Sequence, residues 1–264
     1  MDFAGRLPDQ FSHDLLAGSL LVAKEPINPV RLHLAAAGLR ELFGHILHAD
    51  APDDEVRACS WFVQDQNTET VTRRQKAIYS TQGGLSDGFV EGLGLDVKDL
   101  HKTAIKSIQV LNKATHVRPE TLVSDEAAID AFVQEALSAL DGLLVSFQQG
   151  RDAVKEALVD DVYEAMWDAL IEQTFDEIDI LAGKGYEIDP WIDDQQIEIE
   201  AIRANVVVVR FSGLAHVTLH YGPKHDAAEI PHDFPFWLRF EALVDDPTKL
   251  GLVDHHFDDT GWYT

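Results

Sequence analysis

A change of residue pattern at Gly183-Lys184-Gly185 limits what this chain can fold into. Before this point, apolar residues recur at the three- and four-residue spacing of amphipathic helices, whereas the segments after it are typical of strands. We therefore predict an α+β fold, with a mainly α-helical bundle over residues 1–185 and a small antiparallel β-sheet domain over residues 190–264. The second part is long enough for about three to five strands.

Helical spacing defines a series of segments before the change of pattern. We predict helices over Phe11–Ala23, Val30–His48, Val56–Val63, Glu69–Thr81, Asp99–Ala114, Glu126–Gln149 and Arg151–Leu181, with a short helical turn over Ser86–Leu93. The helix over Val30–His48 is the clearest, because Asn28-Pro29 supplies an N-cap and a proline in the first turn. Its predicted polar arc consists of His33, Arg40, Glu41, Gly44, His45 and His48.

Strand-like sequence follows Gly185. We predict strands over Gln196–Ala201, Asn205–Phe211, Leu214–Tyr221 and Phe234–Val244. Ser212-Gly213 separates the second of these segments from the third, and it predicts a tight turn.

The charge balance restricts the partners of the chain. There are 46 acidic residues against 21 lysines and arginines, which gives a net charge of −25. Such a field repels nucleic acid and anionic membranes at long range, so a polyanion would have to meet a locally positive surface. The most acidic stretch, residues 120–200, carries 22 acidic residues against three basic ones and is most simply a solvated helix face.

One long window has the opposite charge. Residues 72–118 carry eight lysines and arginines against four acidic residues. The predicted nucleic-acid contacts in this window are Arg73, Arg74, Lys76, Lys102, Lys106, Lys113, His116 and Arg118. Lysines along one helix face suit phosphate contacts that position a strand without reading its sequence. The alternative is that these cations neutralise acidic helices within the bundle.

Arg40 and His45 are the predicted catalytic residues. An arginine can hold a phosphate through two hydrogen bonds, and a histidine can act as general base or acid on a ribose 2′-hydroxyl or a leaving oxygen. This chemistry requires no metal. Residues five apart on a helix are separated by about 140° around its axis, so pairing of two copies at a groove would help them to converge. The alternative is a solvated polar face.

The C-terminal part is rich in histidine and aspartate. His216 and His220 would lie on one face of a strand, and His256 and Asp258 could add ligands, so a divalent metal site is an open alternative. The spacing matches no recognised zinc or hydrolase motif. We therefore predict neither a metal nor another cofactor.

The compartment follows from two features of the sequence. The single cysteine, Cys59, excludes an internal disulfide and fits a reducing compartment. The first 25 residues lack a basic region followed by a long apolar core, and no stretch approaches the ~20 apolar residues of a membrane span. We therefore predict a cytoplasmic protein that does not enter a membrane.

Several short segments of the sequence resemble those of a known family. The matching segments are Asn28–Leu32, Leu39–His48, Cys59–Phe62, Thr72–Tyr79, Gln82–Asp87, Ala114–Arg118, Phe234–Phe236 and Asp258–Tyr263. They resemble the family of predicted pPIWI-associating nucleases over nearly the whole chain. That resemblance implies a nuclease of a prokaryotic defence system acting on invading nucleic acid, with a protein partner from the same system.

The helical part, with its arginine and histidine five residues apart, also looks like the HEPN class of metal-independent ribonucleases. Those enzymes carry this pair at a dimer interface, so the resemblance implies a homodimer that cleaves RNA. Carried across, Arg40 would bind the scissile phosphate and His45 would act as base or acid. Two other functions stay open at this point: a non-catalytic acidic module that binds a basic protein or mimics nucleic acid, and a metal-dependent hydrolase.

Overall fold

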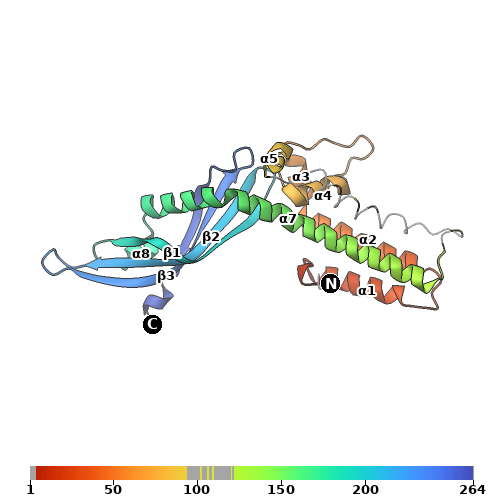
Figure 1. Ribbon diagram of the computed structural model, residues 1–264, viewed down its shortest axis with the longest axis horizontal. Coiled ribbons are helices and arrows are strands. Elements are labelled where there is room, and N and C mark those ends of the chain that lie inside the picture. Colours follow the sequence, from red (N-terminus) through yellow and green to blue (C-terminus); the bar gives the residue numbers. More distant parts are fainter. Residues whose placement is uncertain are drawn as a thin grey trace. The chain divides into compact units, whose positions relative to one another are not determined.

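The computed structural model describes residues 4–93, 102, 106, 109, 120 and 122–263 (Figure 1). The chain forms two compact units, residues 1–151 (unit 1) and residues 152–264 (unit 2). Helices make up the described part of unit 1, and a four-stranded antiparallel sheet dominates unit 2. The predicted α+β class, with helices first and an antiparallel sheet at the C-terminus, is therefore confirmed.

Unit 1 is built from helices close to those predicted. They are α1 (Gln10–Ala23), α2 (Arg31–Asp50), α3 (Asp53–Ala58), α4 (Arg73–Gln82), α5 (Asp87–Gly92) and the first part of α7 (Glu126–Glu172), preceded by the short 3-10 helix η1 (Ala4–Arg6). Asp9 caps α1, and Thr72 forms a reciprocal capping box with Gln75 at the start of α4. Most of the predicted helix over Asp99–Ala114 lies outside the described residues, and the three described positions in it, 102, 106 and 109, are helical.

The core of unit 1 forms where α2 meets α7. Apolar residues of α2 recur every three or four positions, so they share one face and bury it together. This core contains Leu39, Leu42, Phe43, Ile46 and Leu47 of α2 and Leu140, Leu143, Leu144 and Phe147 of α7. Figure 1 shows α1, α2 and the first part of α7 running alongside one another, and α1 also packs against α2.

Two polar residues of α2 are buried against expectation. His33 was predicted on the polar arc of the helix, but it is only 4 % exposed, and Arg31 is buried beside it. The prediction is wrong for His33 because this residue lies only about 60° from the fully buried Ala36 around the helix axis, at the border of the apolar face. Helix α1 comes close to a different side of α2, at Gly38. A Cβ on Gly38 would stand 2.2 Å from the hydroxyl oxygen of Ser19, which shows how closely the two helices approach.

Helix α7 is continuous where the sequence analysis predicted two helices. It runs from Glu126 to Glu172 through Gly150. A glycine weakens a helix but retains the backbone N–H, so it ends the helix only if the neighbouring residues favour another conformation. Here Gly150 has a packing role, since a Cβ would stand 1.9 Å from the carbonyl oxygen of Thr81 in α4.

Unit 2 contains a simple antiparallel meander. Its strands are β1 (Tyr186–Ile202), β2 (Val206–Tyr221), β3 (Ala228–Leu243) and β4 (Gly251–Phe257), paired in the order β1-β2-β3-β4. The odd-numbered residues of β2 from Val207 to Leu219 face the core, where the ring of Phe211 meets that of Tyr163 in α7. The short helix α8 (Asp176–Asp179) follows Phe175, whose ring packs against Phe257 of β4.

The predicted turn at Ser212-Gly213 does not exist. Both residues lie within β2, where Ser212 pairs with Trp237 and Gly213 pairs with Phe236 of β3. The glycine is needed for space, because a Cβ there would stand 2.4 Å from a side-chain methyl group of Ile192 in β1. A Ser-Gly pair within valine-rich sequence therefore marks a close strand-to-strand contact here.

A helix that crosses a bilayer must be both long and apolar. Within the described parts of the chain, no helix combines the necessary length and apolar character.

Replacing Gly150 by alanine is expected to lower the free energy of unfolding, because the added Cβ would collide with the backbone of Thr81. Overpacking of this kind costs about 1–3 kcal/mol. Gly142→Ala in the same helix is the control, since no described atom lies within 4 Å of its added Cβ. Alanine there should raise stability by up to about 1 kcal/mol. Urea unfolding measures both changes, and equal stability of the two variants would contradict the close approach.

Candidate functional site

A strip of α2 remains uncovered between its neighbours. Helices α1 and α4 both pack against α2. Between them, Leu34, Ala37, Glu41, His48 and Ala49 are exposed, and Arg40, Gly44 and His45 are half-buried. We call these eight residues the α2 strip. Both predicted catalytic residues, Arg40 and His45, belong to it.

Arg40 has a second arginine beside it. Arg73 opens helix α4, and its guanidinium Nη2 lies 3.6 Å from the place where a Cβ on Gly44 would stand. Gly44 follows Arg40 by about one helical turn, so the two residues share a side of α2. The pKa of Arg73 is lowered, first by burial and then by the positive charge of Arg40, while Glu41 acts in the opposite direction. Two guanidinium groups are therefore held close together.

Neither arginine has a carboxylate partner among the described residues. The Nε of Arg40 is buried, and within those residues it has no hydrogen-bond partner. Elsewhere in this acidic chain arginines do find carboxylates, as Arg151 does with Asp50 and Arg239 with Glu200. Adjacent guanidinium donors without an internal anion fit a phosphate or carboxylate ligand, which accepts paired N–H donors.

His45 is held by an aspartate from another helix. Its Nε2 lies 2.7 Å from a carboxylate oxygen of Asp9, and the edge of the Phe11 ring packs against the imidazole. The hydrogen bond from His45, followed by that from the Ser12 N–H, lowers the pKa of Asp9 to about 2. Asp9 is therefore ionised near neutral pH and accepts the Nε2 proton, so that Nδ1 of neutral His45 is the proton acceptor.

Sequence reasoning missed both partners in these pairs. It assigned Arg73 only to a separate basic window, and it did not consider Asp9. Arg73 is the first residue of α4, directly after its N-cap, and Asp9 is the N-cap of α1, so each residue lies at a helix start. An N-cap aspartate before an amphipathic helix was visible in the sequence, but its contact with His45 depends on how α1 and α2 pack.

The geometry within α2 separates Arg40 from His45. The five-residue spacing places them about 140° apart around the axis and about 7.5 Å apart along it. Around the helix axis, Gly44 and the adjacent side chain of Arg73 lie between Arg40 and His45. The structure thus brings Arg73 to Arg40, and it places His45 at the opposite border of the same strip.

Lys76 has a different environment from the other predicted contacts. It is only 7 % exposed, and its Nζ lies 2.6 Å from the carbonyl oxygen of Ala51 and 2.5 Å from a carboxylate oxygen of Asp53. It also lies 3.2 Å from Nδ1 of His48. All three ammonium protons are therefore used within unit 1, and Nδ1 of His48 must be an acceptor, because an ammonium group can only donate.

The remaining predicted contacts are either exposed or not described. Arg74, Lys102 and Lys106 are exposed. Lys113, His116 and Arg118 lie outside the described residues.

The C-terminal histidines form pairs with carboxylates. Nδ1 of His216 lies 2.6 Å from Asp233 and its Nε2 lies 3.0 Å from Asp193, so this side chain connects β2 to both neighbouring strands. His220 lies 4.0 Å from Glu187 and 3.8 Å from Glu229. Among the described residues, no group of three or more histidine, cysteine, aspartate or glutamate side chains is placed to hold a metal ion.

Two family models match the chain, one over residues 4–140 and the other over residues 147–263. Both are described as predicted pPIWI-associating nucleases. Together they cover nearly the whole chain, which confirms the resemblance inferred from the sequence. No curated protein and no solved structure matches it.

His216 is expected to make the stability of unit 2 depend on pH. The hydrogen bonds to Asp233 and then to Asp193 raise its pKa above the ordinary value, because both ring nitrogens can donate only in the charged form. Its stabilising contribution is therefore complete below pH about 6.5 and is lost as the pH rises through the raised pKa. The urea midpoint of His216→Gln should fall below that of the unchanged protein at pH 5.5, and the gap should shrink by pH 9.

His220→Gln is the matched control for this measurement, because His220 lies on the same strand and face at longer distances from its carboxylates. Its midpoint should change less at pH 5.5. A gap for His216→Gln that stays constant from pH 5.5 to pH 9 would contradict the proposed charge on His216.

Proposed function

The chain belongs to the family of predicted pPIWI-associating nucleases, and from this premise we propose that it cleaves RNA at the α2 strip. The observation that carries the proposal is the pair formed by Arg40 and Arg73, for which the described residues show no ion pair with a carboxylate. A phosphate is the ligand that both this pair and the family description favour.

Each group has a defined part in the proposed reaction. Arg40 and Arg73 donate hydrogen bonds to the non-bridging oxygens of the scissile phosphate and stabilise the charge that develops there. Nδ1 of His45 removes the proton of the ribose 2′-hydroxyl, and Asp9 stabilises the imidazolium that results. The 2′-oxygen then forms a bond to phosphorus as the bond to the 5′-oxygen breaks, which leaves a cyclic phosphate and a 5′-hydroxyl. None of these steps uses a metal.

The leaving 5′-oxygen needs a proton, and we propose that a second copy of the chain supplies it. His45 of one copy would accept the proton of the 2′-hydroxyl, and protonated His45 of the other copy would donate a proton to the leaving 5′-oxygen. The same residue would then act as base in one copy and as acid in the other. A homodimer that faces two α2 strips toward one phosphate also reduces the separation between Arg40 and His45. The HEPN-like character inferred from the sequence belongs to this part of the proposal.

The setting we propose is a cytoplasmic defence system of a prokaryote. The family description names association with pPIWI, which supports a protein partner. The net charge of −25 opposes the approach of RNA at long range, so a partner that delivers or helps to hold the strand would offset this repulsion.

A non-catalytic acidic module is the second candidate. The observation that favours it is the acidic stretch over residues 120–200, whose 22 acidic residues against three basic ones would attract a basic protein. In that case binding of the partner would weaken steeply with salt, and substitutions at the α2 strip would leave it unchanged.

The first test is cleavage of labelled RNA, single-stranded DNA and double-stranded DNA, with and without EDTA. We expect RNA cleavage that survives EDTA. Arg40→Ala, Arg73→Ala and His45→Ala should each lower the rate by about 100-fold or more, since acid–base and phosphate-binding groups contribute at this level. Arg203→Ala and His225→Ala, at exposed positions of unit 2, are the controls and should cleave normally.

Two outcomes would count against the proposal. Cleavage that requires a metal or persists in all three α2-strip variants would place the site elsewhere. If no substrate is cleaved, either by the protein alone or by the protein mixed with a co-purified partner, the acidic module becomes the better explanation.

A second test separates the charge of Asp9 from its role as a helix cap. Asparagine caps a helix as well as aspartate does, so Asp9→Asn should retain the thermal midpoint of the protein. It removes the negative charge that stabilises protonated His45, and the RNA cleavage rate should fall by more than about tenfold. Normal cleavage by Asp9→Asn would show that the contact with His45 has no part in the reaction.

A further inference from the structure

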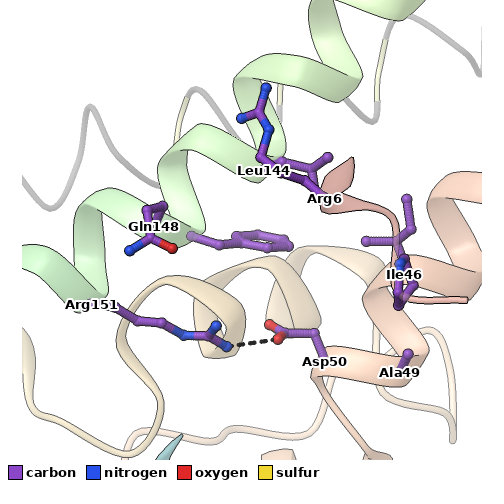
Figure 2. A pocket seen from close by; sticks show the side chains of 9 residues that line it. Arg6, Ile46, Ala49, Asp50, Leu144, Gln148 and Arg151 are labelled. Atoms are coloured by element: carbon purple, nitrogen blue, oxygen red, sulfur yellow. Dashed lines mark hydrogen bonds and ion pairs between the residues drawn. The ribbon is translucent and has the colours of Figure 1, made fainter. Parts of the chain in front are cut away.

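A cavity of about 380 Å³ lies within unit 1, on the side of His45 away from Arg40. Its floor consists of Ile46 of α2 and Leu144 and Phe147 of α7. Figure 2 shows Arg151 paired with Asp50 at one side of the pocket and Arg6 at the other. The remaining lining residues are Pro8, Ala49 and Gln148.

The pocket adjoins the proposed reaction centre. Pro8 lines it, and the next residue, Asp9, holds His45. On the other chain segment, Ile46 lines it, and the preceding residue is His45 itself. In each of these two segments, one residue lines the pocket and its neighbour in the chain takes part in the Asp9–His45 contact. A group seated in the pocket would lie next to His45.

The two arginines retain donors for a ligand. Each has a single carboxylate partner: Arg6 pairs with Asp141, and Nη2 of Arg151 lies 2.9 Å from Asp50. A guanidinium group has five N–H donors, so one carboxylate leaves part of each group available. Both side chains are more than 40 % exposed, which puts these remaining donors within reach of solvent.

Size and lining together indicate the class of ligand. The volume lies near the lower end of the range of about 300–1,000 Å³ that small-molecule sites occupy. A flat apolar group fits against Leu144, Phe147 and Ile46, while an anionic group can meet an arginine at the rim. A nucleotide combines a flat base with a phosphate, and both parts are within the dimensions of such a pocket.

We propose that this pocket binds one nucleoside monophosphate unit, with its base against Ile46, Leu144 and Phe147 and its phosphate held by Arg151. The unit is either one nucleotide of the strand bound along the α2 strip or a free mononucleotide. The choice of a nucleotide over other aromatic anions rests on the proposed function, but its binding does not depend on catalysis.

The test is isothermal titration of the full-length protein with AMP, adenosine, inorganic phosphate and a short oligoribonucleotide. AMP should bind at least tenfold more tightly than adenosine or phosphate, because it uses both the apolar floor and Arg151. Arg151→Gln should weaken AMP binding tenfold or more. Ala49→Leu fills the pocket from an exposed position without removing a charge or a core residue, and it should abolish binding even if Arg151→Gln folds poorly.

Arg203→Gln, an exposed arginine of unit 2, is the control and should bind AMP normally. Loss of AMP binding in Arg151→Gln and Ala49→Leu, with normal binding in Arg203→Gln, supports the pocket even if no RNA is cleaved. Loss in Arg40→Ala alone would move the phosphate to the α2 strip and overturn the proposal. An absence of AMP binding by the unchanged protein at millimolar concentration would also overturn it.

The oligoribonucleotide distinguishes the two sources of the ligand. If the pocket holds a nucleotide of the strand, Ala49→Leu should weaken the oligoribonucleotide and AMP alike. If it holds a free mononucleotide, Ala49→Leu should weaken AMP alone, and AMP should not compete with the oligoribonucleotide. Either result supports the pocket and identifies its ligand.

Discussion

The packing of α2 against α7 determines what the rest of unit 1 can present to solvent. The apolar side chains of Leu39, Phe43 and Ile46 must face α7, and burying each of them contributes about 1.5–3 kcal/mol. With that face fixed, the helical period leaves no freedom for the other residues of α2. Helices α1 and α4 take up the two flanks, and the α2 strip is what remains. Core packing therefore decides which positions of α2 belong to the strip, and the residues at those positions decide its chemistry.

Charge makes this strip unusual within the chain. In a protein with a net charge of −25, an exposed arginine meets carboxylates easily, as Arg210 and Arg239 do when both contact Glu200. Arg40 and Arg73 instead lie beside each other, which costs free energy unless an anion is bound. Ions screen the overall negative field over about 8 Å at physiological salt, whereas contacts within hydrogen-bond distance are screened much less. Local attraction of a phosphate can thus coexist with long-range repulsion.

The sequence predicted the elements of this fold better than it predicted their contacts. Helices α1, α2 and α4 follow from their period and capping residues, and strands β2 and β3 follow from their valine and aromatic content. Both errors in continuity involve glycine. Gly150 and Gly213 suggested breaks, but each is required where a neighbouring segment comes too close for a Cβ. Strand β4 (Gly251–Phe257) was missed because its histidines and aspartate mask the alternation of a short edge strand. The sites depend on tertiary contacts: the pairing of Asp9 with His45 joins residues 36 positions apart, and no local pattern reports it.

One rigid element connects the features that could carry function. Arg40, His45 and Ile46 all lie on α2, whose rise of about 1.5 Å per residue fixes their separations. Around the helix axis the order runs from the arginine pair, through His45, to the pocket floor. A strand that placed its phosphate at Arg40 and Arg73 would therefore pass His45 before its base reached Ile46. Because backbone hydrogen bonds hold this order, substitutions at any one of the three positions can be interpreted without large rearrangement of the other two.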